Sequence, residues 1–359
     1  LIDSGGYSIP NTDNQLVLKE VIKSNNTLYS NRYSGYAQDN ISLSDSGTVY
    51  LTLGLRSNYW DYSKELLISP RATFAFSPRK WKKNYLFRIS SGVYNQPPFF
   101  KEFRDLTGTL NPNIKAQRSI HYVLAMDRNF KAFGNKNFKF TTELYYKQLS
   151  NMIPYEVDNV RIRYYAQNNA KGYATGADFR INGEFVDGLE SWFSLSLLKT
   201  QEDINGDYYF SKGSMGQDSL KIEPGYIPRP TDQRVNFSVF FQDKLLRSPS
   251  NKVHLTLVYG SGLPFGPPDF NRYKDTLRVP SYKRVDIGFS KEFITPEKRV
   301  TNGLLKPFKS LTLYAEVLNL LQVSNVVSYL WVRDVNQAQY AIPNYLTQRQ
   351  VNLRLVARF

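Results

Sequence analysis

The sequence ends in Val351-Asn-Leu-Arg-Leu-Val-Ala-Arg-Phe359, and this stretch decides the fold. Its residues form two alternating sets: Val351, Leu353, Leu355, Ala357 and Phe359 in one, and Asn352, Arg354 and Arg358 in the other. Successive side chains of a β-strand point to opposite faces, so this period of two predicts a strand with one apolar and one polar face. In a membrane β-barrel the apolar face contacts lipid and the polar face lines the lumen.

The same alternation recurs along the whole chain. It predicts strands near 29–43, 47–59, 67–77, 84–94, 117–130, 138–150, 171–184, 189–200, 231–244, 251–262, 281–293, 309–320 and 347–359, and an earlier one around Leu16–Ile22. Most contain about 11 to 14 residues, which is long for a soluble sheet but suits a tilted membrane strand. The sequence therefore predicts an all-β protein, a transmembrane antiparallel β-barrel domain over residues 1–359 with about 13–14 strands.

The connections between these strands alternate in length. Short ones are expected at 44–46, 78–83, 131–137, 185–188 and 245–250, and long ones at 95–116, 151–170, 201–230, 263–280 and 321–346. Two connections depart from this order, 60–66 and 294–308. Bacterial outer-membrane barrels have short periplasmic turns and long external loops. Counting back from Phe359 at the periplasmic end, we expect the long loops outside the cell.

Composition supports a strand-built membrane protein. Tyr (26) and Phe (23) bring the aromatic fraction to 15%, and barrels use such residues as girdles at the two membrane interfaces. No stretch reaches the roughly 18 to 20 apolar residues of a membrane-spanning helix. The chain has no Cys, which suits a compartment where thiols oxidise.

The formal net charge of +15 raises nucleic acid as a partner. The basic residues are scattered, however, and their one tight cluster, Arg79–Lys83, falls where a short turn is expected. No nucleic-acid-binding module is recognisable, so nucleic acid is not an expected partner.

Catalytic and metal-binding motifs are missing from the sequence. Its two histidines, His121 and His254, are far apart and both fall on polar faces of predicted strands. The segment Gly260–Gly266 (GSGLPFG) precedes a Pro-rich loop rather than a helix, so it is not a dinucleotide fingerprint. We expect no enzyme activity, no cofactor and no metal centre.

Two predicted loops carry the best candidates for ligand recognition. Their residues are Phe99, Phe100 and Arg104 in the loop Gln96–Lys115, and Arg161, Arg163, Tyr164 and Tyr165 in the next long loop. Aromatic rings and guanidinium groups suit anionic or sugar-like ligands. The alternative is that these residues pack the loops together or bind lipopolysaccharide phosphates.

Several stretches resemble one known family. They are Ser69–Arg71 (SPR) opening a strand, YNQPPFFKEFRDLTGTLNPNIKAQRSIHY from Tyr94, ELYYKQLSNMIPYEVDNVRIRYYAQNNAKGYATGADF from Glu143, YGSGLPFGPP from Tyr259, SYKRVDIGFSK from Ser281, EVLNLLQVSN from Glu316, and LTQRQVNLRLVARF at the end. In order and spacing these resemble the C-terminal barrel portion of a TonB-dependent outer-membrane receptor of the kind found in Bacteroidetes-type bacteria.

The resemblance implies a barrel of about 22 strands closed by an N-terminal plug, importing a scarce ligand with energy from TonB. The chain contains no plug, no TonB box and no signal peptide over Leu1–Pro10. We therefore expect that it begins inside a longer polypeptide, whose missing plug meets the TonB complex. Two alternatives remain open: a self-contained passive channel of about 14 strands, and a docking module for a surface lipoprotein.

Two further sets of residues receive roles. Charged residues on polar faces are expected to pair across the lumen and, in a complete receptor, to face the plug: Arg56, Arg88, Arg180, Arg234, Arg284, Asp178, Asp286 and Glu316. The resemblance also implies that the barrel assembly machinery reads the terminal aromatic strand through Val351, Leu353, Leu355 and Phe359. Ordinary lipid contact is the alternative for this second set.

Overall fold

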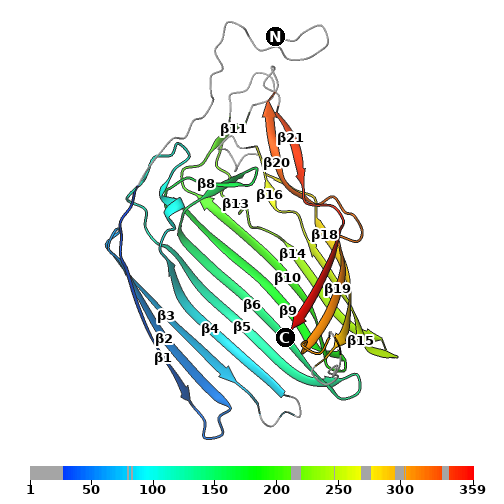
Figure 1. Ribbon diagram of the computed structural model, residues 1–359. Helices are drawn as coiled ribbons and strands as arrows, with labels where there is room; N and C mark the ends of the chain where they lie inside the picture. The colour runs from blue at the N-terminus through cyan, green and yellow to red at the C-terminus, as the bar shows by residue number, and fades with distance from the viewer. Residues whose placement is uncertain are drawn as a thin grey trace, which may run out of the picture.

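The computed structural model describes residues 27–78, 81, 84–211, 220–245, 247–267, 276–295, 303, 305–333 and 339–359. One large curved antiparallel sheet dominates it (Figure 1). In spatial order its strands are β1 (Arg32–Ser42), β2 (Val49–Trp60), β3 (Glu65–Phe76), β4 (Asn84–Gln96), β5 (Gln117–Ala132), β6 (Lys136–Met152), β9 (Ala170–Val186), β10 (Leu189–Ile204), β14 (Val235–Leu245), β15 (Ser248–Gly260), β18 (Tyr282–Ile294), β19 (Ser310–Leu318) and β22 (Gln350–Arg358). A short strand, β13 (Tyr226–Pro228), also pairs with β10.

The all-β antiparallel prediction is confirmed, since each strand expected after residue 27 corresponds to a strand of this sheet. The largest differences are small: one strand expected from 231 begins at Val235, and one expected to end at 200 continues to Ile204. The strand expected around Leu16–Ile22 lies outside the described residues. Of the basic cluster 79–83, only Trp81 is described.

The sorting of the connections is also as expected. Because the strands are antiparallel, successive connections lie at alternate ends of the sheet. We call the end where β4 joins β5 the loop end, and the opposite end, where β5 joins β6, the turn end. The connections that follow β4, β6, β10, β15 and β19 are long, and these five emerge at the loop end, at the top of Figure 1. The connection 61–64 is short although it lies at the loop end, and 295–309 is long although it lies at the turn end.

The long loops contain regular structure that the sequence pattern did not predict. Its elements are a 3-10 helix, η1 (Phe100–Phe103), and the strands β7 (Tyr155–Asp158), β8 (Arg161–Tyr164), β11 (Tyr209–Ser211), β12 (Leu220–Ile222), β16 (Pro264–Phe265), β17 (Leu277–Arg278), β20 (Val326–Arg333) and β21 (Gln339–Tyr345). The eight strands form four separate two-stranded sheets. Each of these strands is too short, or too far from its partner strand in sequence, to be predicted from the periodicity of the sequence alone.

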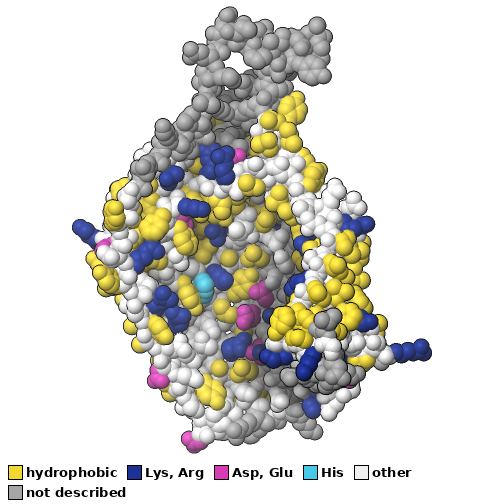
Figure 2. Space-filling view, viewed as in Figure 1, with side chains coloured by type: hydrophobic (Ala, Val, Ile, Leu, Met, Phe, Trp, Pro, Cys, Tyr) yellow, Lys and Arg dark blue, Asp and Glu magenta, His cyan; other side chains and the backbone are white. Residues whose placement is uncertain are grey.

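The two faces of the large sheet differ in chemistry. Large apolar side chains such as Leu55, Leu124 and Leu144 are exposed on the convex outer face. The concave face carries charged residues, among them Arg88, which bonds Asp127. Figure 2 shows basic and acidic side chains together in the hollow, and a dense apolar area on an outer flank. This is the division expected of a sheet with lipid on one side and a polar lumen on the other.

Aromatic rings contact one another at the turn end, as an interfacial girdle requires. Phe138 contacts Phe185 with ring centroids 4.8 Å apart, and Phe185 reaches Phe241 at 6.3 Å. Phe359, 70% exposed at the end of the chain, lies 4.8 Å from Phe308. These contacts join hairpins that are distant in sequence.

Among the residues that the structure describes, the sheet has two open edges, β1 and β22. Every residue of β1 is exposed, and so are all but one of the residues of β22. These two strands begin and end the order of paired strands, and among the described residues they do not pair with each other. Val351, Leu353 and Leu355 stand exposed along the β22 edge. Among the described residues, no helix is long and apolar enough to span a bilayer.

Candidate functional site

Two loops far apart in sequence meet at the loop end and line one cavity of about 980 Å³. One is the loop that follows β4 and contains η1, and the other is the β7–β8 hairpin. The predicted ligand residues that line this cavity are Phe100, Arg104, Arg161, Arg163 and Tyr164. Phe99 and Tyr165, which were predicted with them, are not in its lining.

A buried aromatic cluster fixes the first of these loops onto the sheet. Phe103 of η1 packs edge-on against Trp60 and Tyr62, with ring centroids 5.4 Å away in each case. Ile114 and Ile153 complete the same cluster. Since Trp60 is the last residue of β2, the cluster ties the loop to the strand ends.

A carboxylate beneath η1 adds polar anchoring. Glu102 is buried, and its Oε2 accepts the backbone N–H of Phe99 at 2.7 Å while its Oε1 accepts the Gln117 side-chain amide at 3.0 Å. The oxygen of the same Gln117 side-chain amide accepts a hydrogen bond from the backbone N–H of Ile153. Burial raises the pKa of Glu102, against the lowering effect of these hydrogen bonds. The network joins three loop-end segments at one point.

The arginines of the β7–β8 hairpin differ in availability. The Arg163 side chain is only 15% exposed and lies 3.6 Å from Asp158 and 3.9 Å from Glu156, so its charge is compensated inside the hairpin. The Arg161 side chain is 78% exposed and pairs loosely with Asp158 at 3.5 Å. Arg161, the exposed Arg104 and the exposed Lys101 are therefore the cations that the described lining of this cavity offers to solvent.

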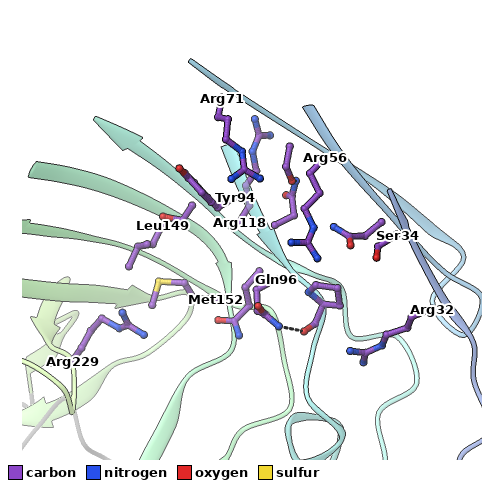
Figure 3. Close-up of a pocket in the computed structure, with 16 residues that line it drawn as sticks. Arg32, Ser34, Arg56, Arg71, Tyr94, Gln96, Arg118, Leu149, Met152 and Arg229 are labelled. Carbon is purple, nitrogen blue, oxygen red and sulfur yellow. Dashed lines mark hydrogen bonds between the residues drawn. The ribbon is translucent and has the colours of Figure 1, made fainter. Parts of the chain in front are cut away.

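A second cavity, of about 660 Å³, opens on the concave face close to the loop end (Figure 3). Its charged lining residues are all arginines: Arg32, Arg56, Arg71, Arg118 and Arg229. Figure 3 shows Arg56 and Arg71 extending from β2 and β3, and Arg229 from the segment after β13, toward the same space. The sequence prediction singled out Arg56 alone of these five.

Register explains how Arg71 comes to lie in this cavity. It pairs with Gly54 on β2 and Gly92 on β4, so a glycine flanks it on each side. A Cβ at Gly54 would come within 3.0 Å of the Arg71 side chain, and one at Gly92 within 2.9 Å. Tyr94 lies 5.6 Å from the Arg71 guanidinium and stacks on His121 at 4.2 Å. The missing side chains leave the space that the arginine occupies.

Elsewhere on the concave face, several charges are paired. Arg88 bonds Asp127 at 2.6 Å and lies 3.6 Å from Glu143. Arg284 bonds Asp286 at 2.7 Å on the same strand. These pairs account for part of the set predicted to line the lumen.

The remaining predicted lumen residues have varied surroundings. Glu316 lies 3.5 Å from His254 and accepts a hydrogen bond from Asn352. Arg180 lies over the Trp192 ring at 5.8 Å. Asp178 is opposite Glu143 and Ser196 in register, Arg234 bonds the buried Asp232 at 2.7 Å, and Arg56 forms no ion pair with any described residue.

The two histidines do not converge. His121 lies on β5 and His254 on β15, with β6, β9, β10 and β14 between them in the sheet. Within the described part of the chain, no group of three or more His, Cys, Asp or Glu residues is placed to hold a metal ion.

One carboxyl group in the loop after β10 makes that loop sensitive to pH. Burial raises the pKa of Asp207 to about 6, and the charges of Asp203 and Glu223 add to the effect. Its Oδ2 is buried and accepts no hydrogen bond from a described residue. Because the folded pKa lies above the ordinary value, the folded loop favours the neutral acid, and its stability falls as pH rises through about 6.

We therefore expect the segment around Asp207 to be more ordered at pH 4.5 than at pH 7.5. The chain has no Cys, so Asn205→Cys gives a single site for a nitroxide label, whose mobility reports order by electron paramagnetic resonance. Mobility should rise with pH in this variant and stay constant when Asp207→Asn is added. An unchanged pH response in the double variant would assign the effect to another group.

Comparison with known proteins gives the family. The model of the family described as TonB dependent receptor-like, beta-barrel matches residues 2–320. The fold is similar to the outer membrane transporter YddB from Escherichia coli, with TM-score 0.60 and 15% identity over 91% of this chain and 45% of that one. The fold is also similar to the siderophore receptor PiuA from Acinetobacter baumannii, with TM-score 0.61 and 17% identity over 91% of this chain and 43% of that one. A third similar structure is the pyoverdine receptor FpvA from Pseudomonas aeruginosa, with TM-score 0.57 and 12% identity over 92% of this chain and 42% of that one.

The chain thus spans less than half the length of these solved structures. No curated protein matches it. The neighbours share its fold at low identity, whereas the family model covers most of the sequence. The chain belongs to the TonB dependent receptor-like β-barrel family, transport proteins of the outer membrane of Gram-negative bacteria.

Proposed function

We propose that this chain is the barrel portion of a receptor that imports a scarce ligand across the outer membrane with energy delivered by TonB. The match of the family model over residues 2–320 is the observation that carries the proposal. The structure supports it with an apolar outer face, a polar concave face and long loops gathered at one end. This domain is assigned residues 1–359, and the TonB complex acts through a plug elsewhere in the complete polypeptide.

The loop-end cavity is assigned to the first capture of the ligand. Its exposed groups include Phe100, Lys101, Arg104 and Arg161, which combine a ring with three cations. Such groups bind anionic or sugar-like molecules through stacking and bidentate hydrogen bonds. Phe99, the residue before Phe100, is 59% exposed, and we assign it to ligand contact outside the lining. Burial raises the pKa of Tyr164 in the cavity wall, and the nearby charge of Glu102 adds to it, so this phenol stays neutral at pH 7.

Other partners follow from the two faces of the sheet. The exposed strand with Val351, Leu353, Leu355 and Phe359 is assigned to recognition by the barrel assembly machinery, in addition to its contact with lipid. Lipopolysaccharide phosphates are the expected neighbours of outward-facing basic residues at the loop end. A surface lipoprotein is the remaining candidate partner, for the long loops.

The test uses the complete polypeptide in cells that either retain or lack it, each with TonB present or deleted. Cells grow in a mixed nutrient medium, and mass spectrometry records which small molecules disappear from it. We expect at least one compound to be depleted only when both the protein and TonB are present.

The alternatives give different results. Depletion that needs the protein but not TonB supports the passive channel, and ion conductance of the purified protein in a planar bilayer would agree with it. Depletion that needs a co-purifying lipoprotein supports the docking module. Absence of any protein-dependent depletion overturns the import proposal.

A further inference from the structure

The geometry points to the arginine cavity on the concave face as the binding site for a small polyanion, a molecule that carries several carboxylate or phosphate groups. The inference rests on the proposed import function, because it names the chemical class of the imported ligand. The cavity is defined by Arg32, Arg56, Arg71, Arg118 and Arg229.

Most charges of this cavity are not balanced by a carboxylate in the described part of the chain. Only Arg229 has a carboxylate partner, Glu202 at 3.3 Å, and no Asp or Glu is among the lining residues. Arg56, Arg71 and Arg118 form no ion pair with any described residue, and Arg32 donates only to the carbonyl oxygen of Pro98 at 2.9 Å. Like charges gathered in a concave site repel one another, and an anion bound among them relieves that repulsion.

The contrast with the rest of the concave face makes this imbalance specific. Arg88, Arg284 and His254 each lie beside a carboxylate. The same sheet therefore balances charges at other places, both toward the turn end and at the loop end, and leaves most of them unbalanced in this cavity. Repulsion concentrated at one place is what a binding site for an anion requires, and it is not a property of the lumen wall as a whole.

The position of Arg71 shows that this site is shaped by the sequence. Glycines at 54 and 92, opposite it on both neighbouring strands, leave room for its side chain. Glycine weakens a strand and packs nothing, so it is used in strands where another group must approach closely. Here that group is the aliphatic part of an arginine whose guanidinium faces the cavity beside the Tyr94 ring.

Size and access fit a small molecule. A volume of about 660 Å³ lies within the range of sites that hold drug-sized ligands. The Arg32 guanidinium lies over the Trp60 ring at 4.1 Å and 5.5 Å from the Phe100 ring, which lines the loop-end cavity. Arg32 therefore stands between the two cavities, and a ligand leaving the loops meets it first.

The experiment measures binding to the purified complete protein in detergent by isothermal titration calorimetry. The probes are citrate and tripolyphosphate, with maltotriose as a neutral comparison. We expect one or both anions to bind and the sugar not to compete with them. Arg56→Gln or Arg71→Gln should each weaken binding about tenfold, and the double variant about 100-fold, since each removes a charge-assisted hydrogen bond. Added salt should weaken binding in the wild type.

Two further variants separate a shaped site from general attraction. Gly92→Ala keeps every charge but crowds Arg71, and we expect it to weaken anion binding as well. Arg354→Gln removes one charge on β22, at the opposite edge of the sheet, and should leave affinity unchanged. Retention of heat-modifiable migration in gel electrophoresis checks that each variant is folded, and Arg71→Lys should recover part of the affinity.

Failure of this inference differs from failure of the import function. If neither anion binds, or if binding is equal in the Arg56→Gln/Arg71→Gln variant and the wild type, the polyanion site is overturned while TonB-dependent depletion remains intact. A loss of affinity in Arg354→Gln equal to that in Arg71→Gln would also overturn it, by showing attraction without a site. Binding that survives deletion of TonB is expected, because no energy is needed for it.

Discussion

Replacing Asp232 by alanine is expected to release the segments that follow β10 and β15 from the sheet. Asp232 is fully buried. Its carboxylate accepts hydrogen bonds from Arg234 Nε and the Thr200 backbone N–H, both at 2.7 Å, and from Arg278 Nη2. Arg278 also donates to the backbone carbonyl of Asp232. One side chain thus joins the end of β10, the start of β14 and the β16–β17 hairpin.

The free energy of local unfolding should fall by about 3 kcal/mol, since two guanidinium groups lose their counter-ion and a buried N–H loses its acceptor. Hydrogen–deuterium exchange measures this at the amides of Thr200 and Val279. Asp187→Ala is the matched control, because it removes an aspartate from an exposed ion pair with Lys136, where a change below about 0.5 kcal/mol is expected. Equal protection at Thr200 in Asp232→Ala and the wild type would contradict this role.

The strands could be predicted from the sequence because their signal is local. On β22, apolar Leu353 and Leu355 flank polar Arg354, and the structure places them on a strand with that alternation intact. Each such strand identifies itself without knowledge of its neighbours. The lengths of the connections then indicated which ends of the strands share one end of the sheet.

The arginine cavity could not be predicted from local patterns, because each of its arginines belongs to a different strand or loop. Arg56 and Arg71 lie diagonally on neighbouring strands only because Gly54 pairs with Arg71. A connection predicted at 60–66 leaves that register uncertain by one residue, and a shift of one residue turns every side chain of a strand to the opposite face. Arg229 enters from a loop whose path no periodicity describes.

For the loop-end cavity, the sequence predicted several of the residues involved but not how the two loops come together. Arginine and tyrosine near 161–165 and aromatic residues near 99 pointed to recognition, and the structure brings five of those seven side chains into one lining. The β7–β8 hairpin was missed because its turn, with Asn159 at a φ of 56°, joins strands of only four residues. The two strongest aromatic anchors, Trp60 and Phe103, gave no signal distinct from the many aromatic residues of the chain.

The division of charge follows the same logic of position. Paired charges such as Arg88 with Asp127 lie where the sheet is regular and a cross-strand partner is within reach. The unpaired Arg56 and Arg71 lie on strands where no register neighbour is acidic: Tyr36 and Ser69 for Arg56, and two glycines for Arg71. The arginines available to a ligand are therefore those whose register neighbours carry no negative charge.

Replacing Phe103 by alanine is expected to unfold the loop between β4 and β5 while the strands remain. Phe103 is 1% exposed and packs against Trp60 and Tyr62. Truncation of a buried Phe costs about 3 to 5 kcal/mol, and the two edge-on ring contacts account for part of it. The strands keep their own backbone hydrogen bonds, so the loss falls on the loop.

Hydrogen–deuterium exchange should show the amides of 97–116 losing protection in Phe103→Ala, with β4 and β5 unchanged. Phe100→Ala is the matched control, since it removes the same side chain from the same 3-10 helix at a position 61% exposed, and a loss below about 1 kcal/mol is expected there. Because Phe103 also lines the loop-end cavity, its removal should abolish ligand capture there. Capture should weaken in Phe100→Ala without loss of loop protection. Full protection of 97–116 in Phe103→Ala would show that Glu102 and Gln117 alone hold the loop, and that the aromatic cluster is not its anchor.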